Sequence, residues 1–160
     1  EIIGDGPERE TLEQQALKQL PDRVSFLGTI GMDAAIKRIA AADCLVLPSD
    51  HDGWGAVVSE AQINGTPVIC SSECGASGTV RASGFGSVFA SGDVNILRQC
   101  LATSLSYGPV SVVNREKLRA WAVCLTAEAG ADYLLEIIHR DQQSPWHSLA
   151  PWERPKPSVK

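Results

Sequence analysis

The residues best suited to chemistry lie in one segment, from Leu47 to Ala61. Its centre, His51-Asp52-Gly53-Trp54-Gly55, is polar and contains two glycines, and an apolar run begins at Ala56. A polar loop that joins a buried strand to a helix N-terminus is a common ligand site in open α/β sheets. The segment therefore predicts a binding site at the carboxyl end of a strand.

A phosphate group suits the start of this predicted helix. Gly53 and Gly55 carry no side chain, so a ligand can approach the backbone closely. The N–H groups of Gly55, Ala56 and Val57 have no partner within the helix and lie at the positive end of its dipole. We expect these residues to bind an anion through their backbone.

Two carboxylates accompany the expected phosphate site. Asp52 lies in the loop, and Glu60, eight residues later, lies one turn into the helix. Carboxylates accept hydrogen bonds from hydroxyls, so the pair could flank a ligand in which phosphates join a sugar and a ribose. The alternative is that Glu60 only stabilises the helix N-terminus and Asp52 only forms the turn. The residues alone leave both interpretations open.

Five short apolar runs alternate with amphipathic stretches along the chain, which is typical of parallel βαβ units. They predict strands at Glu1–Gly4, Val24–Leu27, Cys44–Leu47, Pro67–Cys70 and Ser87–Ala90. One intervening helix is expected from about Ala56 to Asn64, with Gly65 as its C-terminal cap. After Pro109 only helices are expected, the first of them capped by Asn114. The fold class is therefore α/β, with a Rossmann-like, doubly wound parallel sheet.

These patterns divide the chain into three predicted parts. Residues 1–108 form the α/β domain, residues 109–141 form C-terminal helices, and residues 142–160 form a tail rich in proline and tryptophan. Trp146 and Trp152 in this tail either pack on their own domain or bind a surface outside this chain.

Composition narrows the class of protein. With 160 residues, 44 % of them hydrophobic, the chain can bury one core, and a net charge of −5 argues against binding nucleic acid by bulk charge. No apolar run is long enough to cross a bilayer, and the first residues lack the basic-then-apolar pattern of a signal peptide, so we expect none. The five cysteines lack metal-ligand spacing, so we interpret them as reduced core residues and expect a cytoplasmic protein without a metal site.

Five motifs occur in order between Glu1 and about Leu105. They are Ile3-Gly4-Asp5-Gly6-Pro7, Val24-Ser25-Phe26-Leu27-Gly28, Ala42-Asp43-Cys44-Leu45-Val46-Leu47-Pro48-Ser49, Asp52-Gly53-Trp54-Gly55 with Glu60-Ala61, and Gly65-Thr66-Pro67-Val68-Ile69. Together they resemble the nucleotide-sugar-binding domain of family 4 retaining glycosyltransferases, which have the GT-B fold. Each motif alone is weak, but five in order at family-like spacing are specific.

The resemblance implies roles for the loop residues. Glu60 would bind the ribose hydroxyls of the donor nucleotide, and Asp52 takes the first place of the family's Glu-x7-Glu motif, beside the donor sugar. Gly53-Trp54-Gly55 stands where Gly-Phe-Gly is commoner. The backbone from Gly55 through Ala56 to Val57 would donate hydrogen bonds to the sugar and the diphosphate.

The resemblance also implies contacts outside that backbone. Gly28 and Thr29 match the loop beside the nucleobase, and His51 would lie near the donor. The family needs no metal or cofactor, because the acceptor hydroxyl attacks on the face that the diphosphate leaves and electrostatics stabilise the leaving charge. The family's Arg and Lys for this task would precede Glu1, and the nearby cations, Lys37, Arg38 and Arg81, fit no motif.

The implied protein is the C-terminal, donor-binding part of a glycosyltransferase. It would transfer a hexose from a UDP-, GDP- or ADP-sugar to a glycan or lipid-linked acceptor, which a missing N-terminal domain would bind. We therefore expect the isolated chain to be inactive. Alternatives are a non-catalytic nucleotide-sugar-binding or interaction fragment, and a nucleotide-sugar epimerase of the GT-B fold. No nucleic-acid partner is expected, while peripheral membrane association of the full enzyme and homo-oligomerisation stay open.

The resemblance makes one prediction about the sheet. In the strand order 3-2-1-4-5-6 the first strand would lie before Glu1. We expect the strands that begin at Glu1 and Cys44 either to be direct neighbours or to be separated by a strand from elsewhere.

Overall fold

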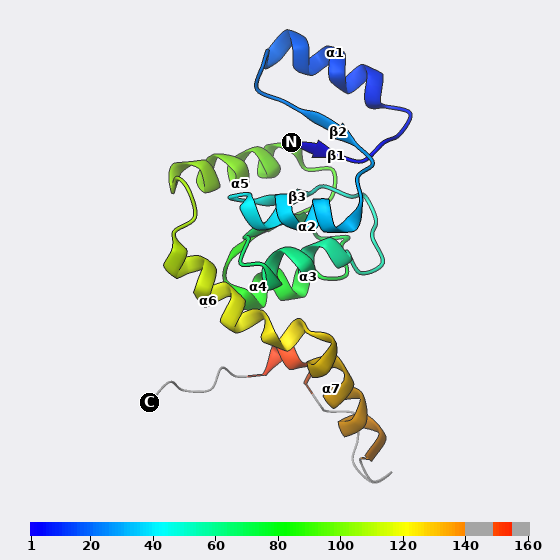
Figure 1. Ribbon diagram of the computed structural model, residues 1–160, viewed down its shortest axis with the longest axis vertical. Helices are drawn as coiled ribbons and strands as arrows, with labels where there is room; N and C mark the ends of the chain where they lie inside the picture. The colour runs from blue at the N-terminus through cyan, green and yellow to red at the C-terminus, as the bar shows by residue number, and fades with distance from the viewer. Residues whose placement is uncertain (140–148, 155–160) are drawn as a thin grey trace. The chain divides into compact units, whose positions relative to one another are not determined.

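The structure, a computed structural model, describes residues 1–139 and 149–154. It divides into two compact units, Glu1–Arg38 and Ile39–Lys160, here called the first and the second unit. Figure 1 labels the elements of both units. The boundary at Arg38 was not predicted, since the sequence placed its first division after residue 108.

The first unit is built on one βαβ motif. Strand β1 (Ile2–Ile3) pairs in parallel with β2 (Phe26–Gly28), and helix α1 (Arg9–Gln19) connects them. The N–H of Gly4 donates to the carbonyl of Gly28 at 2.9 Å, which extends the pairing by one residue. Arg9 pairs with Asp5 and Glu13, and no residue of α1 is buried.

The second unit contains a three-stranded parallel sheet. Its strands are β3 (Leu45–Leu47), β4 (Val68–Ser71) and β5 (Gly86–Phe89), in the order β3-β4-β5. All four residues of the central strand β4 are buried. Helices α3 (Ala56–Ile63) and α4 (Ser77–Ser83) follow β3 and β4 and make the crossovers between parallel strands.

The core of the second unit lies between this sheet and its helices. It combines residues of β4, α3, α4 and the loop between β4 and α4 with the end of α2 (Met32–Ala41): Ile39, Val58, Ala61, Val68, Cys70, Cys74, Ala76 and Val80. A polar network is buried beside it, in which Thr79 donates to Gln62 Oε1 at 2.7 Å and Gln62 donates to Ser83 at 3.2 Å. Each buried polar side chain of this network therefore has a partner, as burial requires.

The remaining helices continue the second unit. Helix α5 (Val94–Ser106) is capped by Asp93, and it is followed by α6 (Val112–Ala122), the 3₁₀ turn η1 (Val123–Leu125), α7 (Ala127–His139) and the 3₁₀ turn η2 (Pro151–Glu153). Helix α6 packs against α3 and α4. Its cap is Ser111, whose hydroxyl accepts from the N–H of Asn114, so the prediction that Asn114 is the cap was wrong by three residues.

The structure confirms most of the predicted elements. All five strands form, with ends shifted by one or two residues, and Gly65 has the left-handed conformation expected of a C-terminal cap, with φ of +80°. Among the described residues β1 and β3 are not hydrogen-bonded neighbours, so direct pairing of these strands is not observed. The alternative, an intervening strand from elsewhere, stays a prediction. No described helix has the length and apolar character needed to cross a bilayer.

Candidate functional site

Two loops lie side by side at the carboxyl ends of β3 and β4. They are residues 48–55, which lead into α3, and residues 72–76, which lead into α4. Asp52 and Cys74 form a parallel bridge: the N–H of Asp52 donates to the carbonyl of Glu73, and the N–H of Gly75 to the carbonyl of Asp52, each at 3.1 Å. The loop that carries the predicted site is therefore fixed by its neighbour.

Gly75 makes this close approach possible. A Cβ atom at this position would collide with the carbonyl oxygen of Gly53 and lie 3.0 Å from the Cα of Trp54. Only glycine fits without moving one of the two loops. A lone glycine after a strand is too common in sequences to have indicated this role for Gly75.

Gly55 sets the direction in which α3 begins. Its φ is +80°, which favours glycine, and a Cβ here would collide with the thiol of Cys74 and approach Leu47 Cδ2 to 3.3 Å. Its carbonyl accepts the N–H of Val58 at 2.8 Å, which closes the first turn. The turn and the packing together therefore require glycine at position 55.

The start of α3 presents free donors, as the sequence predicted. Within residues 1–139 and 149–154, no hydrogen bond engages the N–H groups of Gly55, Ala56 or Val57. Gly55 is buried and Ala56 is exposed. These N–H groups and the helix dipole together favour an anion at this end of α3.

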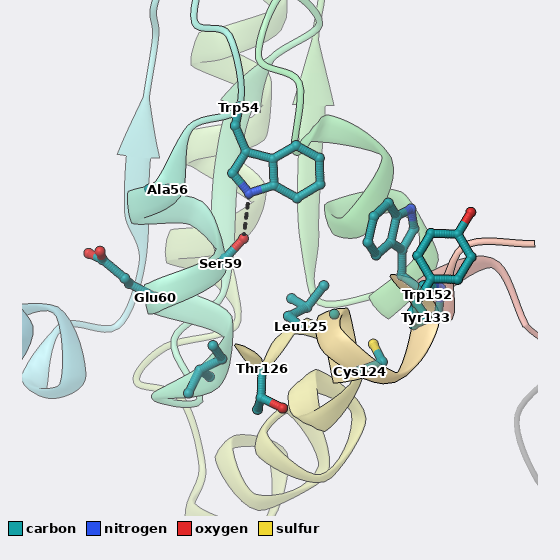
Figure 2. Close-up of a pocket in the computed structure, with 12 residues that line it drawn as sticks. Trp54, Ala56, Ser59, Glu60, Cys124, Leu125, Thr126, Tyr133 and Trp152 are labelled. Atoms are coloured by element: carbon teal, nitrogen blue, oxygen red, sulfur yellow. Dashed lines mark hydrogen bonds between the residues drawn. The ribbon is translucent and has the colours of Figure 1, made fainter. Parts of the chain in front are cut away.

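The two predicted carboxylates both lie on this loop and helix. Asp52 and Glu60 are each half-buried, and neither side chain has a hydrogen bond or ion pair within the described part of the chain. In Figure 2 the carboxylate of Glu60 points away from the rings of Trp54 and Trp152. The carboxylate is thus available on a different side of α3 from those rings.

The other predicted binding residues divide between the two units. His51 is exposed in the loop of the second unit. Gly28 and Thr29 belong to the first unit, where Gly28 is buried at the end of β2 and Thr29 is exposed. The Gly28 carbonyl already accepts a hydrogen bond from Gly4, so a ligand would meet the exposed Thr29 more readily than Gly28.

Trp54 lies at the edge of a cavity of about 280 Å³ (Figure 2). Its indole N–H donates to the hydroxyl of Ser59 at 3.2 Å. The ring of Trp152 lies 5.4 Å from it, centroid to centroid, at 55°. The cavity is lined by residues of α3, η1, α7 and η2 and by Thr126 between η1 and α7: Ala56, Ser59, Glu60, Ile63, Cys124, Leu125, Thr126, Gly130, Tyr133, Pro151 and Trp152, besides Trp54 itself.

The position of Trp152 decides between the two interpretations of this residue that the sequence left open. It packs within its own unit, against Trp54, as the first interpretation of the tail predicts. Trp146 lies outside the described residues. The sequence did not indicate that Ser59 and Trp152 contact Trp54 in particular, because neither residue belongs to a recognisable motif.

A larger cavity, of about 500 Å³, lies elsewhere in the second unit. Residues of β4, β5 and α5 line it, together with the segment that follows α5. None of the predicted site residues contributes to it. The size of a cavity therefore does not mark the candidate site here.

The structure also describes the cysteines and two of the cations that fit no motif, Arg81 and Arg38. Burial raises the pKa of the Cys70 thiol to about 12, and all five cysteines are free thiols. Arg81 donates to the hydroxyl of Ser77 within α4 at 3.3 Å, and Arg38 pairs with Glu1 in the first unit. Across the described residues no three His, Cys, Asp or Glu side chains are grouped as metal ligands.

Solved structures show which class of fold this is. The structure of WaaG, a glycosyltransferase involved in lipopolysaccharide biosynthesis, superimposes with a TM-score of 0.67 over 87 % of this chain and 37 % of its own, at 22 % identity. The fold is therefore that of one half of a GT-B glycosyltransferase, with Rossmann-like topology.

Sequence comparison gives the family. The family model for glycosyl transferases group 1 matches residues 1–106, so the chain belongs to this family. The 2-deoxystreptamine N-acetyl-D-glucosaminyltransferase of Streptomyces fradiae is 40 % identical over 68 residues, which are 42 % of this chain and 16 % of that protein. A GDP-mannose-dependent monoacylated alpha-(1-6)-phosphatidylinositol monomannoside mannosyltransferase of Corynebacterium glutamicum is 35 % identical over 107 residues, 62 % of this chain and 28 % of that protein. The chain thus spans less than a third of either relative.

Proposed function

We propose that this chain is the C-terminal, donor-binding part of a family 4 retaining glycosyltransferase. The full protein would transfer a hexose from a nucleotide diphosphate sugar to a glycan or lipid-linked acceptor. The segment Asp52–Glu60 carries the proposal, because two carboxylates and three backbone N–H groups without partners among the described residues occur together on it. The segment lies within the part of the chain that the family model matches.

The start of α3 would act on the leaving group. As the bond between the sugar and the diphosphate breaks, negative charge develops on the diphosphate oxygen. The N–H groups of Gly55, Ala56 and Val57 would stabilise that charge, and because their loop is already fixed by its neighbour, little reorganisation is needed. No metal or other cofactor is part of this proposal.

The side chains would orient the donor. Glu60 would accept hydrogen bonds from the ribose hydroxyls, and Asp52 would accept from a hydroxyl of the sugar. Trp54 and His51 would border the donor from the same loop. Separately, in the first unit, Thr29 and Gly28 would contact the nucleobase. The identity of the sugar would depend on single hydroxyl contacts of this kind.

The acceptor and the remaining catalytic groups would come from the longer protein. The curated relatives named above are several times the length of their matched segments. We therefore expect the isolated chain to bind nucleotide but not to transfer sugar. A longer protein that contains this chain should transfer from at least one member of a panel of UDP-, GDP- and ADP-sugars, and failure with every donor would overturn the transferase proposal.

The direct test is titration of the chain with UDP and GDP by calorimetry. Glu60→Gln should weaken nucleotide binding about tenfold or more, because it removes a charged hydrogen-bond acceptor from the ribose. Glu116→Gln is the matched control, since it removes an exposed glutamate of α6 and should leave binding unchanged. Binding that is insensitive to Glu60→Gln would overturn the ribose assignment, and binding of neither nucleotide would overturn donor binding.

A further inference from the structure

The segment Leu149–Arg154 contacts the candidate site through the side chain of Trp152. Trp152 of η2 lies against Trp54, with ring centroids 5.4 Å apart and an interplanar angle of 55° (Figure 2). Almost a hundred residues separate these two rings along the chain. Such tilted aromatic pairs stabilise a contact beyond the apolar area that they bury.

The segment around Trp152 has its own attachments. Arg154 pairs with Glu136 of α7 and lies 5.9 Å from the ring centroid of Tyr133 on the same helix. It also donates to the carbonyl of Leu149 at 3.2 Å, while Glu153 accepts the N–H of Ala150 at 3.2 Å. Trp152 is therefore placed by contacts that do not involve Trp54, and it can act as a fixed support.

Trp54 is held at its backbone and at one edge of its ring. Its carbonyl accepts the N–H of Ala76 at 2.6 Å and the thiol of Cys74 at 3.3 Å, and its indole N–H donates to Ser59. Trp54 remains 42 % exposed, and Trp152 is its aromatic neighbour.

The surroundings leave the Trp54 ring room to move. It borders the cavity of about 280 Å³, so the space beside it is unfilled. Its chain neighbours are Gly53 and Gly55, which restrict the backbone less than any other residue would. Without Trp152 the ring could turn, and only the backbone contacts of Asp52 and Trp54 with the neighbouring loop would then restrain this segment.

We propose that Trp152 is a positioning residue for the donor loop: it holds the Trp54 ring, so that the N–H groups of Gly55, Ala56 and Val57 keep the directions needed to bind the diphosphate. This inference rests on the proposed function, because it takes that loop as the diphosphate site. It gives the C-terminal segment a role in donor binding without direct contact with the donor.

The first test measures UDP and GDP binding to the full chain. Trp152→Ala should weaken binding of the nucleotide that the parent chain binds by about two- to tenfold, the range expected for loss of an aromatic pair. Trp152→Phe keeps a ring and should stay within about twofold of the parent chain. Leu149→Ala is the matched control, because it truncates an exposed apolar side chain of the same segment and should change nothing.

A second readout does not depend on nucleotide. The N–H groups of Asp52, Val58 and Ala76 donate to loop carbonyls or to the adjacent loop, so their hydrogen exchange in the free protein reports opening of this region. Trp152→Ala should speed their exchange about two- to tenfold, while Trp152→Phe and Leu149→Ala should not.

The outcomes separate the two proposals. If the parent chain binds nucleotide and Trp152→Ala leaves both affinity and exchange unchanged, the positioning role is wrong. If Trp152→Phe weakens binding as much as Trp152→Ala, a role of the aromatic ring is also wrong. If the parent chain binds neither nucleotide, the proposed function fails, whereas faster exchange in Trp152→Ala would still establish that Trp152 restrains the loop.

Discussion

The two units of this chain differ in how many of their residues are buried. In the first unit both strand residues of β1, Ile2 and Ile3, are about two fifths exposed, and α1 buries no residue. In the second unit β4 is wholly buried and Val58, Ala61, Leu118 and Ala122 have no exposed surface. A two-stranded parallel pair with one surface helix is marginal by itself, whereas three strands covered by helices can hold a core.

This difference suggests why the candidate phosphate site lies where it does. The loop before α3 is anchored to a rigid core through Gly55, Cys74 and the bridge at Asp52. Backbone N–H groups bind an anion well only if their directions are fixed beforehand. The second unit supplies that rigidity, so substitutions in its core should cost more stability than matched substitutions in the first unit.

The strongest contrast is between two glycines with similar backbone conformations. Gly86 in β5 has φ of +138° and Gly4 has φ of +128°. A Cβ at Gly86 would collide with the carbonyl of Val68, whereas nothing lies within 4 Å of a Cβ at Gly4. Gly86→Ala should therefore cost about 3 kcal/mol or more of unfolding free energy, and Gly4→Ala about 1 kcal/mol.

Denaturant titration followed by tryptophan fluorescence can measure this contrast. The tryptophans that the structure describes, Trp54, Trp121 and Trp152, belong to the second unit, so their fluorescence reports on that unit. Gly86→Ala should lower the midpoint strongly, and Gly4→Ala should leave it almost unchanged. Equal shifts for both variants would mean that the two units unfold as one, and the contrast would be lost.

The second contrast concerns leucines. Leu118 of α6 is fully buried, whereas Leu17 of α1 is 73 % exposed. Leu118→Ala should destabilise the second unit by about 2–5 kcal/mol, since it leaves a cavity. Leu17→Ala should change the unfolding free energy by less than about 0.5 kcal/mol. Thermal unfolding followed by circular dichroism would measure both changes in unfolding free energy. A large loss of stability in Leu17→Ala would contradict the exposure of Leu17.

The third prediction concerns the buried polar network. Thr79→Val should cost about 1–3 kcal/mol, because Gln62 Oε1 loses the hydroxyl that donates to it at 2.7 Å while staying buried. Thr103→Val, at an exposed position of α5, is the control and should be near neutral. If Thr79→Val is as stable as the parent in urea denaturation, the network does not contribute to the rigidity argued for this unit.

The last prediction concerns the chemical reactivity of the Cys70 thiol and involves no substitution. Burial raises the pKa of Cys70 to about 12, so below that pH the folded protein keeps this thiol protonated, and the thiolate is the reactive form. At pH 8.5 iodoacetamide should label Cys70 much more slowly in the folded protein than in urea. Peptide mapping by mass spectrometry would measure the labelling of Cys70. Rapid labelling of this residue in the folded protein would contradict its burial in the core.

Local patterns were sufficient to predict much of this fold. The strands follow from short apolar runs, and the start and end of α3 follow from Gly55 and Gly65, because left-handed backbone conformations favour glycine. The spacing of Asp52 and Glu60 placed them on one loop and helix, since eight residues of known local structure fix their separation.

Other features depend on contacts between distant residues. Gln62 is polar, yet it is fully buried because Thr79 and Ser83 of α4 provide its partners. The role of Gly75 depends on its approach to Gly53, a residue of another loop. Neither could be predicted from the residues near it in sequence.

The sequence by itself determined the fold class, the strands and the loop that bears the candidate site, because these depend on the local periodicity of apolar residues and on backbone conformation. The tertiary structure alone decided that Cys74 closes against Gly55, that Trp152 covers Trp54, and that a compact unit ends at Arg38. These features require segments far apart in the chain to meet, and the free energy of such contacts depends on which surfaces are buried together.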